Sequence, residues 1–162
     1  MQLKRTLSPS LSTRSGVHFP YVRKKRTTLR YHVTVGIGGN LGDVGRRFEH
    51  LFFALQRERR VDVVRTSLIL KNPPFGFKNQ DDFLNSIIVL QTDMQPVAFL
   101  DYLMRLEKKF GRTRSFANAP RTLDLDIIFF DNRVIDLPKL QVPHPSWSKR
   151  ESVVIPLAEL NR

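Results

Sequence analysis

Hydrophobic positions along the chain follow the period of a strand in some segments and the period of a helix in others. Four runs are rich in β-branched and aromatic residues and stop near glycine, proline or polar turns, which predicts strands. These runs cover residues 32–38, 61–70, 83–90 and 123–130. Two intervening segments carry apolar residues at helical spacing, which predicts amphipathic helices. Their apolar stripes consist of Phe48, Leu51, Phe52 and Leu55 in the first and Phe99, Leu103, Leu106 and Phe110 in the second.

Residues at the ends of these segments support the same boundaries. Asp43 precedes the first helix and can cap it, and Pro96 suits the first turn of the second. Gly111 follows the second helix, where glycine commonly ends one. The glycines of GIGGN, residues 36–40, indicate a tight turn from the first strand into the first helix.

The predicted order is β-α-β-β-α-β, which is the ferredoxin-like arrangement of the α+β class. Such a sheet is largely antiparallel and has both helices on one face. We therefore expect loops to cover the other face or a ligand to bind there. The long loops 71–82 and 111–121 are placed to do this, so we expect the active site on that face.

Charge divides the chain into two parts. The 162 residues have a formal net charge of +12. Residues 1–30 contribute eight basic residues and no acidic ones, whereas residues 31–162 hold 19 basic and 15 acidic residues, a surplus of +4. We interpret residues 1–30 as a basic, Ser/Thr-rich extension and residues 31–162 as one domain. A mildly basic domain suits a small anionic substrate.

Composition narrows the class of protein further. The chain has no cysteine, which excludes disulfides and thiolate metal sites. No apolar run reaches the roughly 18 residues of a membrane-spanning helix, so we expect a cytoplasmic protein without a membrane partner. The extension could be flexible or partly docked, a transit peptide or a nucleic-acid contact, and we favour the first. Its removal should spare catalysis, because the first predicted strand begins near His32.

Two carboxylates interrupt the last predicted strand, in the sequence APRTLDLDIIFFD. Strand side chains alternate between faces, so Asp124 and Asp126 share the face opposite to that of Leu125 and Ile127. Two close carboxylates repel each other unless a cation neutralises them, and Mg²⁺ is typically held by one or two carboxylates plus substrate phosphates. The alternative is an edge strand whose aspartates pair with nearby arginines.

Further candidates lie on the neighbouring segments. Phe83 and Asn85 would present an aromatic ring and an amide on one strand face, a pair that suits a flat heterocycle with polar edges. A core phenylalanine beside an exposed asparagine would give the same spacing. Glu107 lies close to the apolar stripe of its helix, where it either pairs with an arginine or faces the site.

Basic residues near the aspartates could bind phosphate. Arg112, Arg114 and Arg121 follow one another without an intervening acid, and guanidinium groups match phosphate oxygens. A solvated surface loop would give the same pattern. The GIGGN segment lacks the lysine and hydroxyl residue of a Walker-type phosphate loop. His144 could be either a packed loop histidine or a phosphate donor.

These residues together resemble a known family. PRTLDLDIIFFDNRVI, LQVPHP, Arg150 and VIPLAEL follow in the order seen in 6-hydroxymethyl-7,8-dihydropterin pyrophosphokinases of folate biosynthesis. GIGGNLGD and NPPFGFKNQDDFLN are similar to the same family. The resemblance covers roughly residues 33–160.

The resemblance implies transfer of pyrophosphate from ATP to the pterin hydroxymethyl group, with release of AMP. It implies two Mg²⁺ ions on Asp124 and Asp126, and catalytic roles for these aspartates and for Arg112 and Arg121. The implied ATP ligands are Glu107, Arg112, Arg114, Arg121, Ile127, His144 and Arg150. The implied pterin contacts are Pro74, Phe75, Phe83 and Asn85.

Two other classes of function stay open at this point. A ferredoxin-like, basic chain could be an RNA-binding module, although no segment has the RNP1 pattern. The aspartate pair would also suit another Mg²⁺-dependent nucleotidyl or phosphoryl transferase. We expect a monomer that uses ATP and the pterin and binds no nucleic acid.

Overall fold

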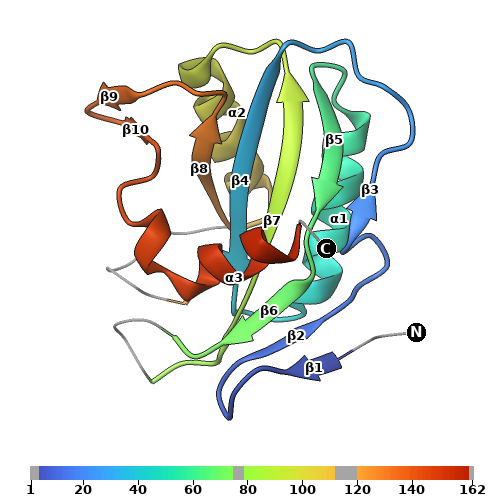
Figure 1. The fold of residues 1–162 in the computed structure, drawn as a ribbon, viewed down its shortest axis with the longest axis vertical. Coiled ribbons are helices and arrows are strands. Elements are labelled where there is room, and N and C mark those ends of the chain that lie inside the picture. Colours follow the sequence, from blue (N-terminus) through green and yellow to red (C-terminus); the bar gives the residue numbers. More distant parts are fainter. Residues whose placement is uncertain (1–3, 75–78, 112–119, 161–162) are drawn as a thin grey trace.

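A computed structural model describes residues 4–74, 79–111 and 120–160. In chain order, the elements are β1 (Lys4–Thr6), β2 (Ser12–Arg14), β3 (Tyr21–Val22), β4 (Tyr31–Gly39), α1 (Val44–Arg57), β5 (Val61–Thr66), β6 (Ile69–Asn72), β7 (Phe83–Thr92), α2 (Pro96–Lys109), β8 (Asp124–Phe130), β9 (Ile135–Leu137), β10 (Leu140–Val142), the short 3₁₀ helix η1 (Trp147–Lys149) and α3 (Glu151–Glu159). One sheet runs through the whole arrangement (Figure 1).

Within the described residues the main sheet has the strand order β1-β2-β6-β7-β4-β8. Strand β5 also pairs with β7, beyond the end of β6, and β3 pairs with β5. Every pair in the sheet is antiparallel. A small hairpin of β9 and β10 stands apart from it. The prediction of an α+β protein with a largely antiparallel sheet is therefore confirmed.

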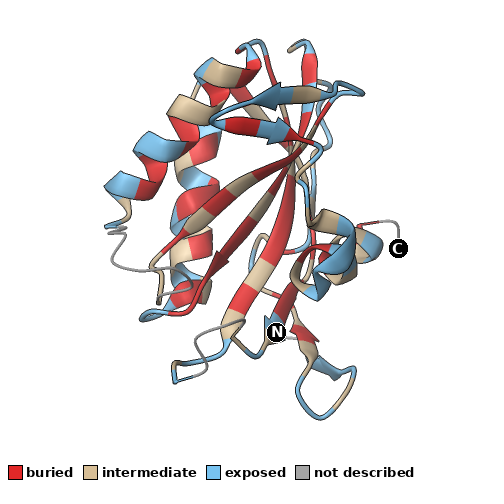
Figure 2. Ribbon diagram, turned by 90° about the vertical axis from the view of Figure 1, so that its left-hand side faces the viewer, coloured by how far each residue is buried: buried red, intermediate tan, exposed pale blue. Residues whose placement is uncertain are grey.

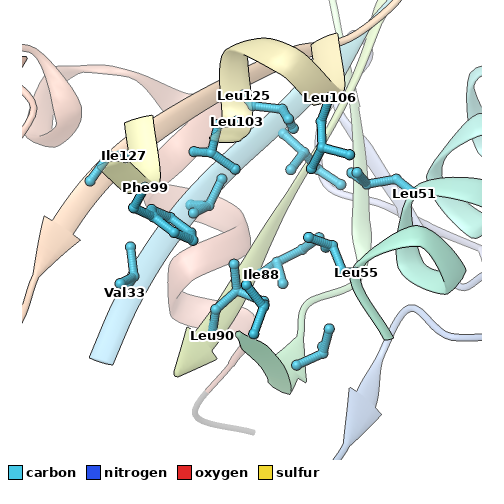
Figure 3. Packing of buried hydrophobic residues seen from close by; sticks show 14 of the residues in the cluster. Val33, Leu51, Leu55, Ile88, Leu90, Phe99, Leu103, Leu106, Leu125 and Ile127 are labelled. Carbon is cyan, nitrogen blue, oxygen red and sulfur yellow. The ribbon is translucent and has the colours of Figure 1, made fainter. Parts of the chain in front are cut away.

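The main core lies between the sheet and helices α1 and α2. Alternate residues of β4, β7 and β8 point toward these helices, and Val33, Ile88 and Leu125 are among them (Figure 3). Leu51 and Leu55 of α1 meet Phe99, Leu103 and Leu106 of α2 over the same strands. Burial of such side chains contributes about 1.5–3 kcal/mol each, which makes this layer the main source of stability.

The predicted helix ends are confirmed. The Asp43 side chain accepts a hydrogen bond from the backbone N–H of Arg46 and so caps α1. Pro96 occupies the first turn of α2, where its missing N–H costs no hydrogen bond. Gly111 follows α2 with a φ of +83°, a conformation that residues with a Cβ rarely adopt.

The sequence prediction needs three corrections. The run 61–70 is two strands, because Ser67 turns inward, where its hydroxyl accepts a hydrogen bond from the N–H of Ile87. Three short strands precede the strand predicted to begin near His32. Gly36, Gly38 and Gly39 belong to β4, and the turn into α1 is made by residues 40–43, with Gly42 at a φ of +71°.

A third helix lies on the face expected to carry loops. Figure 2 shows α3 on the opposite side of the sheet from α1 and α2. Val153 and Leu160 form a second apolar cluster with Ile87 of β7 and Ile128 of β8. Helix α3 therefore covers the part of this face that carries Ile87 and Ile128.

Candidate active site

The aspartate pair lies on β8, which ends the strand order of the sheet. Leu125 and Ile127 point into the core beneath α2, as Figure 3 shows. Asp124 and Asp126 alternate with them and are half-buried on the opposite face. This confirms the period-two prediction for the two carboxylates.

At Gly36 and Gly38, the neighbouring strand β4 places no side chain between the aspartates of β8 and strand β7. Gly38 is paired with Asp124 on one side and Asn85 on the other, and Gly36 is paired with Asp126 and Ile87. A Cβ on Gly38 would overlap the amide oxygen of Asn85. The two glycines therefore form a backbone floor between a carboxylate strand and an amide strand.

The predicted pterin residues lie on the β7 side of this floor. Phe83 and Asn85 are half-buried, and Pro74 is half-buried at the end of the strand β6 segment. The Asn85 amide donates a 2.6 Å hydrogen bond to the Asn72 side-chain oxygen on β6, which fixes the orientation of the amide. Phe75 lies outside the described residues.

Arg121 immediately precedes β8 and extends toward the aspartates. Its guanidinium Nη1 lies 3.5 Å from the Oδ2 of Asp124, and both side chains are about a quarter exposed. This contact is the ion pair considered as the alternative to a metal site, and a guanidinium at this distance is equally placed for a phosphate beside Asp124. Arg112 and Arg114 lie outside the described residues.

Glu107 connects α2 to the aspartate strand. The side chain is 5% exposed, and its Oε2 accepts a 2.8 Å hydrogen bond from the backbone N–H of Leu125. Leu125 is the residue between the two aspartates. Glu107 therefore holds the β8 backbone in place at the residue between Asp124 and Asp126.

Ile127 has its side chain in the core, 4% exposed, so this side chain does not share the face of the aspartates. Its backbone groups point in the same direction as those of Leu125, toward the outer edge of β8. A contact between Ile127 and a nucleotide base would therefore come from its backbone.

His144 and Arg150 approach the site from the segment after β10. Burial lowers the pKa of His144 below its ordinary value, the charge of Arg150 lowers it further, and the charge of Asp124 opposes them. His144 Nδ1 accepts a 3.3 Å hydrogen bond from the N–H of Ser146, which leaves Nε2 as the nitrogen that can face a ligand. The exposed side chain of Arg150 stands at the start of α3.

The side chains around the aspartates can be compared with the ligands that Mg²⁺, the metal implied by the family resemblance, requires. Within the described ranges, no three His, Cys, Asp or Glu side chains converge to hold an ion. Two neighbouring carboxylates that share a half-buried face nevertheless fit Mg²⁺, which takes one or two carboxylates and completes its octahedron with water and phosphate oxygens. In the described part of the chain, the buried Thr122 hydroxyl beside them has no hydrogen-bond partner.

Sequence reasoning missed two polar residues of this region. Asn72 orients Asn85, and Asn40 hydrogen-bonds to segments on both sides of β4. The position of Asn40 directly after a glycine-rich strand, at the end where the other candidates gather, was the available signal.

The face of the sheet thus combines two carboxylates on β8, an amide on β7 and a basic residue before β8, a combination that fits a transferase acting on a phosphorylated substrate. The comparisons with known proteins identify the family. Residues 34–162 match the family model described as 7,8-dihydro-6-hydroxymethylpterin-pyrophosphokinase. The chain belongs to this family and is a pyrophosphokinase of folate biosynthesis that uses ATP.

Curated relatives carry the same activity in their names. The 2-amino-4-hydroxy-6-hydroxymethyldihydropteridine pyrophosphokinase of Campylobacter jejuni is 38% identical over 139 residues, which cover 86% of this chain and 88% of the relative. The enzyme of the same name from Helicobacter pylori is 37% identical over 142 residues, covering 86% and 87%. That of Synechocystis is 36% identical over 126 residues, covering 78% and 64%.

No helix within the described ranges is long and apolar enough to cross a membrane.

Proposed function

We propose that the face of the sheet around Gly36 and Gly38 is where pyrophosphate passes from ATP to the hydroxymethyl group of the dihydropterin. The observation that carries this proposal is the row Asn85–Gly38–Asp124 across three adjacent strands. It puts an amide that suits the pterin edge on one side and a carboxylate that suits a metal–triphosphate complex on the other.

On the donor side, Asp124 and Asp126 hold Mg²⁺, with two ions expected. When bound, the metal neutralises charge on the triphosphate and orients it. Arg121 moves from Asp124 to a phosphate oxygen, while His144 and Arg150 contact the same chain of phosphates, together with Arg112 and Arg114. Glu107 and the Ile127 backbone support the nucleotide at the outer edge of β8.

On the acceptor side, Phe83 provides the aromatic surface for the pterin ring, and Asn85 bonds its polar edge. Pro74 and Phe75 complete the contact. Asn72 holds the Asn85 amide in one orientation, so the amide is arranged before the ligand arrives. Such preorganisation lowers the entropic cost of placing the alcohol for attack.

We further propose that residues 31–162 form the catalytic domain, that its core is ferredoxin-like, and that residues 1–30 are an extension packed against it. The element order β4-α1-β5/β6-β7-α2-β8 and the strand order β8-β4-β7-β5/β6 support the ferredoxin-like class. We expect a cytoplasmic monomer without a nucleic-acid partner, since both substrates are small molecules.

The test of this function is product analysis. The protein should convert ATP to AMP only when Mg²⁺ and 6-hydroxymethyl-7,8-dihydropterin are both present. Formation of ADP, or AMP formation without the pterin, would contradict the proposal. Replacing Asn85 by Leu should raise the pterin KM with little change in the KM for ATP, because this amide lies on the pterin side of Gly38.

A further inference from the structure

Asn40, the residue that follows β4, has an unusually complete set of hydrogen bonds for a buried side chain. It is 4% exposed. Its Oδ1 accepts a 2.8 Å hydrogen bond from the N–H of Arg121. Its Nδ2 donates to the Gln80 Oε1 at 2.8 Å and to the Asp81 carbonyl at 3.0 Å. The backbone N–H of Asn40 also donates to the Arg121 carbonyl at 2.9 Å.

These bonds begin where the sheet ladders stop. The pairing of β4 with β7 ends at Gly39 and Leu84, and the pairing of β4 with β8 ends at Gly38 and Asp124. One residue further on, Asn40 reaches both neighbouring segments with a single side chain. It therefore joins the segment that enters β7 to the segment that enters β8.

The two joined segments lead to opposite halves of the proposed site. Asp81 lies two residues before Phe83, on the pterin side, whereas Arg121 lies three residues before Asp124, on the phosphate side. Asn40 is thus the side chain that relates the position of one half to that of the other.

The chemistry of the amide fits this task. Asparagine offers an acceptor oxygen and two N–H donors on one short side chain. Aspartate could still accept from the Arg121 N–H but could not donate to Gln80 or Asp81. An apolar residue would leave the Arg121 N–H and the Asp81 carbonyl without these partners.

Arg47 of α1 provides a comparison within the same corner. Its Nη1 donates to the carbonyls of Leu41 and Thr122, at 2.6 and 2.8 Å. These bonds hold the β8 entrance against the end of β4, but they reach no described residue of the β7 entrance. Asn40, by contrast, bonds to both entrances.

We propose that Asn40 is a positioning residue that sets the distance between the pterin alcohol and the triphosphate. The inference rests on the proposed division of the site into a pterin side on β7 and a phosphate side on β8. Asn40 touches neither substrate in this proposal. Its loss lets the two entrances shift relative to each other, and a misplacement of about 1 Å can cost on the order of 10²-fold in rate.

The test separates kcat from KM in Asn40→Asp, which keeps the acceptor and removes both donors. We expect kcat to fall on the order of 10²-fold, with the KM of each substrate within a few-fold of the wild-type value, because each half keeps its own contacts. Asn132→Asp is the matched control, since it makes the same chemical change at an exposed turn after β8. It should retain wild-type kinetics.

A second variant guards against a folding defect. Gln80→Leu removes one of the two acceptors on the β7 side and leaves Asn40 intact, so a several-fold fall in kcat at unchanged KM is expected. Thermal unfolding should show both variants folded at the assay temperature.

An unchanged kcat in folded Asn40→Asp, or a loss confined to the KM of one substrate, would overturn the positioning role. Both results would leave the proposed function intact, provided the wild-type protein makes AMP in a pterin-dependent reaction. If the wild type made no AMP, the proposed function itself would fail.

Discussion

The two edges of the sheet, at β8 and at β5 and β6, differ in what lies against them. On one side, β8 ends the strand order, and the backbone N–H of Leu125 is met by the Glu107 carboxylate. On the other, β6 and β5 are followed by β2 and β3 of the N-terminal segment. The β8 edge therefore lies beside the charged site, whereas the opposite edge is covered by additional chain.

The covered side is also well packed. Phe19, between β2 and β3, is fully buried and lies in the main core with Phe48 and Phe52 of α1. Next to it, the His18 Nδ1 forms a 2.7 Å hydrogen bond with the Glu49 carboxylate, and the His18 ring stacks on Phe52. Unpaired strand edges invite association with other chains, and a docked segment removes that hazard.

The family model and one relative match different lengths of the chain before β4. The family model starts at residue 34, so it leaves β1, β2 and β3 outside. Residues 34–162 number 129, yet the match with the Campylobacter jejuni enzyme covers 139 residues of this chain, so at least 139 − 129 = 10 of them precede residue 34. The match therefore extends back at least to residue 24, just after β3.

The first prediction addresses the charged side of the comparison. Asp126→Ala should lower activity by several orders of magnitude, since each tenfold loss needs only about 1.4 kcal/mol of transition-state stabilisation. The apo protein should be equally or more stable, because repulsion from Asp124 is relieved. Steady-state kinetics with Mg²⁺ check the activity, and thermal unfolding in EDTA checks the stability of the apo protein. Asp136→Ala in the β9–β10 hairpin is the control. Unfolding of the variant with retained specific activity would identify the aspartates as structural.

The second prediction separates phosphate binding from metal binding on the same side. Arg121→Ala should reduce the rate on the order of 10³-fold if this guanidinium bears charge developed in the transfer. Mg²⁺ binding, measured by calorimetry, should be nearly unchanged because the carboxylates remain. Strongly weakened Mg²⁺ binding in this variant would show that Arg121 instead organises the metal site.

The third prediction addresses the covered side. Phe19→Ala should lower the free energy of unfolding by about 3–5 kcal/mol, the usual cost of emptying a buried phenylalanine site. In the fraction that stays folded, kcat should be close to that of the wild type, because Phe19 lies in the helix-side core rather than on the site face. Denaturant titration and activity per folded molecule test this.

Removal of residues 1–30 should destabilise the protein in the same way as Phe19→Ala. Loss of kcat in a fully folded truncation would instead connect the segment to catalysis.

The smallest expected effect concerns pH. Because burial lowers the pKa of His144 below its ordinary value of 6.5, the unfolded chain takes up this proton more readily than the folded one. The histidine's contribution to stability is present above that value and is lost as pH falls through the lowered pKa. In EDTA, His144→Asn should show a shallower loss of stability below about pH 6.5 than the wild type. Parallel curves would contradict a depressed pKa.

The strands and helices around the main core could be predicted because their pattern is local. Period-two alternation placed Asp124 and Asp126 on one face, and helical spacing identified the stripe of α2. Helix α3 was missed because Pro156 lies inside it and because residues 153–158 are all apolar and so show no helical period. The strands β1 to β3 are two or three residues long and depend on distant pairing, because β2 pairs with β6, β3 pairs with β5, and β1 pairs only with β2 in the described sheet.

The parts of the site that depend on distant contacts were beyond sequence reasoning. The residue type at Asn40 does not reveal that its partners are 40 and 81 positions away. Glu107 was recognised as unusual, but its acceptance of the Leu125 N–H across 18 residues follows only from the packing of α2 on β8. Residue chemistry was therefore predictable where it alternated along one strand, and unpredictable where one side chain joins several segments.

The glycine floor has a consequence for inhibitor design and resistance. Gly38 is buried with the Asn85 amide oxygen over it, so a compound bound here would contact the Asn85 side chain and backbone atoms of the half-buried Gly36, which every amino acid shares. Any side chain added at Gly38 would collide with the amide oxygen of Asn85, and through it would disturb the residue proposed to bind the substrate. A substitution at Gly38 that displaced a compound from Asn85 would therefore also disturb the proposed pterin contact, which limits resistance at this position.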